Sequence, residues 1–117
     1  MRIIARRTLR EFVEKRAGHK DQRALKAALD AWFDEAGKAR WTSTADVKRF
    51  YATASIVSAE RIVFNMVVRS ARASPPKGND YRLVVAVDFE KGIVWIKWIG
   101  THRDYDRIDV TEVEYDG

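Results

Sequence analysis

Two apolar β runs, residues 81–89 and 93–99, are separated by only three residues, 90–92. So short a connection lets the two strands pair only as an antiparallel hairpin. A third run, residues 61–68, precedes them, and one of its two alternating faces is wholly apolar, as in a half-buried strand. The carboxy-terminal half of the chain therefore predicts consecutive strands of a mostly antiparallel sheet.

Apolar residues recur at three- and four-residue steps in two stretches of the amino-terminal third, which predicts two helices. The first covers residues 6–17 and the second begins at Asp21, and Gly18 and Gly37 are placed to end them. The apolar faces consist of Leu9, Phe12, Val13 and Ala17 in the first helix and Leu25, Ala28, Leu29, Trp32 and Ala36 in the second. Both faces are interpreted as core-facing surfaces.

Shorter segments complete the outline. Residues 2–5 and 46–51 are predicted as short strands, and residues 70–80, which contain two prolines, as a loop. The acidic residues 110–117 are expected to be ordered only in part. Helices at one end and strands at the other favour an α+β fold, a single domain over residues 1–117. Two amino-terminal helices would cover one face of a mostly antiparallel sheet of four or five strands, leaving the other face free to bind.

The chain is basic, with 22 Lys and Arg against 17 Asp and Glu. Residues 1–26 hold nine basic and three acidic side chains, and residues 101–117 hold two basic and six acidic. A basic balance favours a polyanionic partner, because phosphates neutralised by Lys or Arg release counterions. The alternative is ordinary solvated surface charge, which suits most basic proteins equally well.

Several classes of protein are disfavoured by composition. The chain has no cysteine, which rules out disulfides and thiolate metal sites, and its two histidines are too few for a His-based zinc site. No apolar run approaches the roughly 20 residues that span a membrane. The amino terminus lacks the apolar core of a signal peptide, so a cytoplasmic protein without a membrane partner is expected.

Residues 100–106 concentrate a histidine, an arginine, a tyrosine and two aspartates directly after the last β run. A histidine at a strand exit suits acid–base chemistry, since its unperturbed pKa is about 6.5. A helical turn would set Tyr105 beside His102. The alternative is a capping and ion-pairing turn with a structural role, and spacing alone favours that alternative.

Alternation places Arg82 on the polar face of its strand, and Arg61 and Asn65 on the polar face of the preceding one. If the strands are neighbours, these side chains could converge, and a guanidinium there could bind a phosphate with two hydrogen bonds. The alternative for Arg82 is a cross-strand ion pair, for example with Asp88.

The last β run holds one lysine and two tryptophans. Lys97 alternates with Trp95 and Ile99, which favours an isolated polar residue on a packed face. The same alternation predicts Trp95 and Trp98 on opposite faces, so one is expected in the core and the other is free to stack on a nucleic-acid base.

Residues 61–65, 81–85 and 95–106, the last ending in Thr-His-Arg-Asp-Tyr-Asp, resemble the HigB toxin family in order, β pattern and terminal signature. A short first strand followed by two helices agrees as well. The resemblance implies a RelE-like fold and an mRNA interferase that cuts mRNA on the ribosome and is neutralised by a cognate antitoxin, expected to be of the helix-turn-helix type. The connection over residues 69–80 is longer than the family's usual link.

The resemblance also implies the chemistry, which needs no metal and no cofactor. The ribose 2′-hydroxyl attacks the adjacent phosphate and leaves a 2′,3′-cyclic phosphate and a 5′-hydroxyl. His102 and Tyr105 become candidates for proton transfer, and Arg82, with Arg61 or Lys97, for charge stabilisation. Asn65 and Arg103 are further candidates for RNA contacts. A non-catalytic module that binds RNA or protein through the same basic surface, and tolerates loss of His102 and Tyr105, is the alternative.

Overall fold

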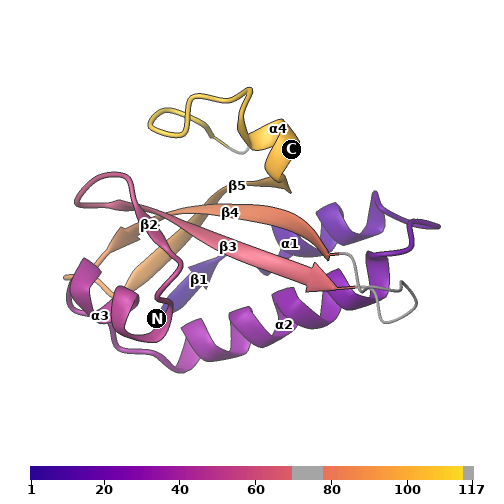
Figure 1. Ribbon diagram of the computed structural model, residues 1–117. Coiled ribbons are helices and arrows are strands. Elements are labelled where there is room, and N and C mark those ends of the chain that lie inside the picture. The colour runs from indigo at the N-terminus through magenta and orange to yellow at the C-terminus, as the bar shows by residue number, and fades with distance from the viewer. Residues whose placement is uncertain (70–77, 115–117) are drawn as a thin grey trace.

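The chain is seen in a computed structural model that describes residues 1–69 and 78–114 (Figure 1). Within these ranges the elements run in the order β1 (Arg2–Ile4), α1 (Arg6–Glu14), α2 (Gln22–Lys38), α3 (Thr44–Phe50), β2 (Ser55–Ile56), β3 (Arg61–Arg69), β4 (Gly78–Asp88), β5 (Ile93–Thr101) and α4 (His102–Tyr105). The predicted α+β fold is confirmed. In this part of the chain no helix is long and apolar enough to cross a membrane.

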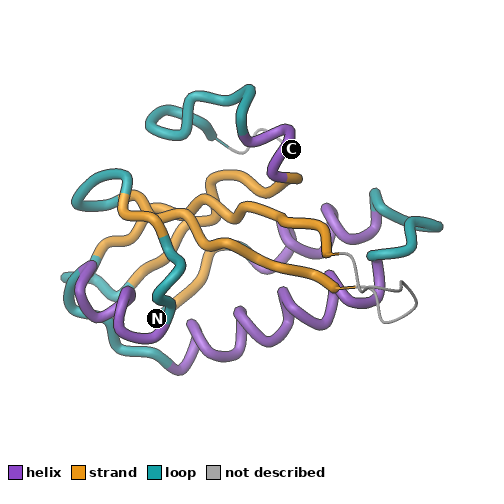
Figure 2. Tube along the Cα trace, in the orientation of Figure 1, coloured by secondary structure: helices purple, strands orange, loops and turns teal. Residues whose placement is uncertain are grey.

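The strands form one sheet in the order β1-β5-β4-β3-β2 (Figure 2). β1 runs parallel to β5, and every other neighbouring pair is antiparallel. The predicted hairpin of β4 and β5 lies in the middle of the sheet. Its tight turn ends at Gly92, whose φ of +69° is a left-handed conformation that glycine adopts without steric cost.

Helices α1 and α2 cover one face of this sheet, as predicted (Figure 1). The longer helix, α2, turns Leu25, Leu29, Trp32 and Ala36 into the core, all of them buried. The apolar faces of the three central strands complete this core. They contribute Ile62, Phe64, Val68, Tyr81, Leu83, Val85, Val87, Val94, Ile96 and Ile99. The remaining face of the sheet is thereby left for other contacts.

An aromatic cluster ties the helices to β3. The ring of Phe64 lies 5.3 Å from that of Trp32 in α2, 6.1 Å from Trp41 and 5.0 Å from Tyr51, centroid to centroid. Edge-on and offset contacts of this kind add to the free energy gained by burial alone. Phe64 therefore fixes α2, the connection that follows it and the end of α3 against one point of the sheet.

The strand predicted over residues 46–51 is wrong, because these residues lie mostly in helix α3. The backbone N–H of Asp46 donates to the Ser43 hydroxyl (3.3 Å), and the Asp46 carboxylate accepts from the backbone N–H and hydroxyl of Thr42 (2.8 and 2.7 Å). These reciprocal caps satisfy donors at the helix start. Val47 is the residue through which α3 is buried against the rest of the protein.

Two boundaries each differ from the prediction by three residues. Helix α1 ends at Glu14, three residues early, and the chain leaves it through a turn in which Gly18 has a φ of +82°. Residues 78–80 were expected in a loop, but they extend β4 and pair with the end of β3. The rest of that loop, residues 70–77, lies outside the described ranges. The two-residue strand β2 has too short a pattern to be predicted.

Strand β5 contains a β-bulge at Lys97. The register with β4 shifts between Val84 and Val85, so that Lys97 is an extra residue without its own partner. An extra residue moves every side chain beyond it to the other face of the strand. Trp95 and Trp98 therefore lie on the same face, and the predicted placement on opposite faces is wrong.

Candidate functional site

The face of the sheet turned away from α1 and α2, here called the outer face, carries the polar residues of the central strands. Helix α4 and residues 106–114, here called the C-terminal segment, lie over this face (Figure 1). From the register, the outer face comprises Arg61, Val63, Asn65 and Val67 of β3, Asp80, Arg82, Val84, Ala86 and Asp88 of β4, and Ile93, Trp95, Trp98 and Gly100 of β5.

The middle of the outer face is apolar and buried. Val63 and Val84 are register partners, only 3% and 0% exposed, yet neither belongs to the main core between sheet and helices. Their burial follows from the C-terminal segment above them and the long side chains around them. Partial order was expected for residues 110–117, and within that range residues 110–114 pack against the sheet.

One end of the outer face holds Arg82 and Asn65, which are register partners. β3 and β4 are therefore neighbouring strands, which was the condition for these two side chains to converge. The Arg82 guanidinium donates a hydrogen bond to the Asn65 amide oxygen. Asp88, the alternative partner for Arg82, instead accepts from the backbone N–H of Lys91 (2.9 Å) in the hairpin turn. A neutral amide positions the guanidinium without cancelling its charge, so Arg82 keeps the capacity to bind an anion.

The indole of Trp98 lies close against Gly100, the register partner of Arg82. A Cβ built on Gly100 would come within 2.4 Å of the Trp98 ring, so only glycine permits this approach. The Trp98 ring also contacts that of Tyr105, with centroids 6.2 Å apart and planes inclined by 52°. Trp98 is therefore held from two sides and remains only half-buried. Trp98 was one of the two tryptophans considered for stacking on a base, whereas Gly100 was not a predicted site residue.

Helix α4 is a single turn that begins where β5 ends, as predicted for residues 100–106. The Thr101 hydroxyl accepts from the backbone N–H of Asp104 (3.1 Å) and caps the turn. His102 and Arg103 are exposed, whereas Tyr105 is half-buried against Trp98. The turn is thus a capped structural element that also presents its side chains at the Arg82 end of the outer face, since Arg82 pairs with Gly100 in the register.

The other end of the outer face holds Arg61 and Lys97, which converge on one carboxylate. The Arg61 guanidinium lies 3.0 Å and the Lys97 ammonium 2.8 Å from different oxygens of Glu114. Lys97 is therefore not the isolated polar residue on a packed face that alternation favoured, because the bulge and the ion pair bring it to the outer face.

The predicted site residues thus fall into two groups rather than one. Arg61 and Asn65 are four residues apart on β3, which corresponds to roughly 13 Å along a strand. The first group is Asn65 and Arg82 with helix α4, and the second is Arg61 with Lys97. The two groups are spaced to contact different parts of an extended ligand.

Two acidic side chains of the C-terminal segment, Glu114 and Asp109, have lowered pKa values. The hydrogen bond from Lys97, followed by the charges of Lys97 and Arg61, lowers the pKa of Glu114 below its ordinary value. The pKa of Asp109 is lowered chiefly by hydrogen bonds from the hydroxyl and backbone N–H of Thr111. Across residues 1–69 and 78–114, no three or more His, Cys, Asp or Glu side chains gather in a way that could hold a metal ion.

A comparison with protein families finds the model of the HigB toxin, the RelE-like toxic component of a toxin–antitoxin system, over residues 25–108. The chain belongs to this family. The HigB match includes both groups of site residues and α4, and it ends before Glu114. Membership makes an antitoxin the expected partner. No curated protein matches the chain.

Proposed function

We propose that this HigB-family toxin is an endoribonuclease that cuts mRNA on the ribosome. The observation that carries the proposal is the Arg82 guanidinium, held by the Asn65 amide at the end of the outer face where α4 presents His102 and Tyr105. A fixed cation beside two groups able to transfer protons is what phosphodiester cleavage requires. The cognate antitoxin, of the helix-turn-helix type, would neutralise the activity in the cytoplasm.

The reaction takes the metal-independent form that the family resemblance implies. The ribose 2′-hydroxyl loses its proton to a base and attacks the adjacent phosphorus, and the bond from phosphorus to the 5′-oxygen breaks as that oxygen gains a proton. His102 and Tyr105 supply the base and the acid. Arg82 stabilises the negative charge that develops on the phosphoryl oxygens in the transition state.

The aromatic surface beside Arg82 supports RNA rather than a smaller anion as the ligand. Trp98 is half-buried and fixed between Gly100 and Tyr105, so its ordering entropy is already lost before a base stacks on it. Arg61, roughly 13 Å from Asn65 along β3, would contact a second phosphate of the same strand together with Lys97. Arg103, exposed on α4, would add a contact to the backbone near the cleaved bond.

The test is cleavage of ribosome-bound mRNA by purified Arg82→Ala and His102→Ala proteins. Each should lower the rate by about 100- to 1000-fold, the usual cost of losing one transition-state donor or proton-transfer group. Arg23→Ala is the matched control, because Arg23 is an exposed arginine of α2 on the far side of the sheet, and it should cleave as the unmodified protein does. Thermal unfolding checks that all three variants keep the fold.

Product ends test the chemistry separately. Cyclic or 3′-phosphate ends, formed equally well in EDTA, support 2′-hydroxyl attack, and a strict Mg²⁺ requirement contradicts the metal-independent form. If His102→Ala and Arg82→Ala both cleave at the normal rate, the assigned site is wrong. If no cleavage occurs while RNA or an antitoxin still binds, the chain is a non-catalytic binding module instead.

A further inference from the structure

The C-terminal segment returns to the sheet and is held there by Arg61 and Lys97. The Arg61 guanidinium donates to the backbone carbonyl oxygens of Val110 (3.2 Å) and Val113 (2.8 Å) and to the Glu114 carboxylate (3.0 Å). Lys97 donates to the other carboxylate oxygen (2.8 Å). The side chain of Arg61 is only 14% exposed, so its charge is directed at this one point.

The arrangement around Glu114 is one that a phosphate would also satisfy. Two cations come from two different elements, Arg61 from the start of β3 and Lys97 from the bulge of β5, and each binds a different oxygen of one anion. A phosphodiester presents two such unesterified oxygens, and guanidinium and ammonium groups bind them with strong, charge-assisted hydrogen bonds. Without an anion between them, the two cations would repel each other.

The partner that fills this position is itself easily released. The Glu114 side chain is 59% exposed, whereas those of Arg61 and Lys97 are 14% and 22% exposed. An ion pair with one solvated member contributes little, and salt screens it further. The cations are therefore fixed parts of the sheet, while the carboxylate is the replaceable part.

We propose that Arg61 and Lys97 form a phosphate-binding subsite for RNA, and that Glu114 occupies this subsite in the free protein as a built-in competitor. The inference rests on the proposed function, because it takes an RNA phosphodiester as the displacing ligand. RNA binding exchanges the carboxylate for a phosphate and lifts the C-terminal segment from the outer face. Glu114 lies beyond residue 108, where the family match ends, so the competitor is inferred from this chain's own contacts and not from the family match.

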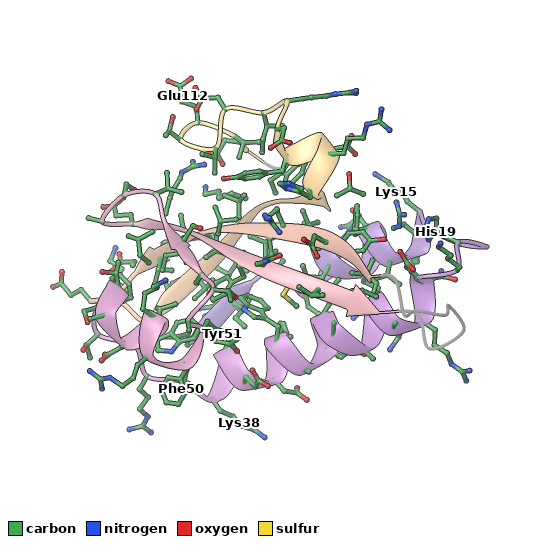
Figure 3. All side chains as sticks on the ribbon, in the orientation of Figure 1. Lys15, His19, Lys38, Phe50, Tyr51 and Glu112 are labelled. Atoms are coloured by element: carbon green, nitrogen blue, oxygen red, sulfur yellow. The ribbon has the colours of Figure 1, made fainter. Side chains whose placement is uncertain are left out.

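The experiment measures binding without cleavage. A fluorescent single-stranded RNA with 2′-O-methyl groups cannot undergo 2′-hydroxyl attack, and its fluorescence anisotropy reports affinity alone. Glu114→Gln should bind about two- to fivefold more tightly at low salt, as expected for loss of one exposed ion pair that opposes binding. Glu112→Gln is the matched control, since it makes the same charge change at an exposed residue of the same segment (Figure 3) and should bind nearly as the unmodified protein does.

Salt dependence gives a second readout that a general charge effect would not move in the same way. RNA places the same phosphate at Arg61 and Lys97 in the unmodified protein and in Glu114→Gln, so the slope of log affinity against log salt should be nearly the same in the two proteins. Lys97→Gln combined with Glu114→Gln should lose the tighter binding, and its slope should be shallower by about 0.7, the value for one lost phosphate contact on a single strand.

Equal affinities for Glu114→Gln and Glu112→Gln would overturn the inference, and so would absence of RNA binding in every variant. Tighter binding by Glu114→Gln alone supports it even if no variant cleaves mRNA, in which case only the proposed enzymatic function fails. Conversely, normal cleavage together with equal affinities leaves the enzyme intact and removes the competitor.

Discussion

Gly100→Ala should destabilise the protein through one identified contact, the ring of Trp98. The added Cβ would lie 2.4 and 2.5 Å from two atoms of the indole, and an ordinary contact begins at 3.4 Å, so the ring must retreat by about 1 Å. That movement opposes the packing of Trp98 on Tyr105. Overpacking of this kind costs about 1–3 kcal/mol of unfolding free energy. Urea unfolding followed by circular dichroism measures the change.

The sign of the effect should reverse when the ring is absent. Among the glycines in the described ranges, positive φ occurs at Gly18 and Gly92, so Gly100 has a backbone that alanine can adopt. Without the clash, replacing glycine by alanine in a strand stabilises by about 0.5–1 kcal/mol. Gly100→Ala should therefore stabilise a Trp98→Ala protein. If the substitution costs the same in both backgrounds, the close approach of the indole is not the cause.

Two further perturbations test the parts of the fold that position the site. Phe64→Ala removes the ring shared by α2 and α3 and should lower the unfolding free energy by about 3–5 kcal/mol, measured by urea unfolding, and a loss below about 1 kcal/mol would contradict its central place. Asp46→Asn should lower the free energy of unfolding near neutral pH, and the loss should be smaller in acid. Hydrogen bonds from Thr42 lower the pKa of Asp46 in the folded protein. The stability that its carboxylate contributes is therefore present above the unfolded pKa of about 3.9 and is lost as the pH falls through the folded pKa. A gap between the two proteins that is equally wide at pH 7 and pH 3 would refute this assignment.

Regular periodicity made most of the fold predictable. The apolar steps in α2 and the alternation in β3 each extend over many residues. Burial follows the pattern closely in α2, whereas in β3 the outer-face residue Val63 is buried as well. The mistaken strand at residues 46–51 arose where the pattern was short. The capping sequence Ser43-Thr44-Ala45-Asp46 was the available signal, because a hydroxyl residue followed three positions later by an acidic one favours a helix start.

The site was harder to predict, because it depends on two events that alternation does not record. The bulge at Lys97 changes the phase of β5, and with it the faces of Trp95 and Trp98. Glu114 reaches Arg61 across 53 residues of sequence, a contact that local composition does not encode. Arg82 and Asn65 were predictable together, since two neighbouring antiparallel strands with polar residues on one face must bring some of them into register.

The parallel pairing of β1 with β5 has a consequence for how the toxin is made. Arg2 pairs with Ile93 and Ile4 with Trp95, so β1 cannot pair in the sheet until residues 93–95 have been synthesised. Contacts of such long sequence separation form late, since loop closure must precede them. The strand that completes the sheet is also the one that leads into α4 and carries Trp98. A growing chain in which β5 has not yet been made therefore lacks both the complete five-stranded sheet and the outer-face site.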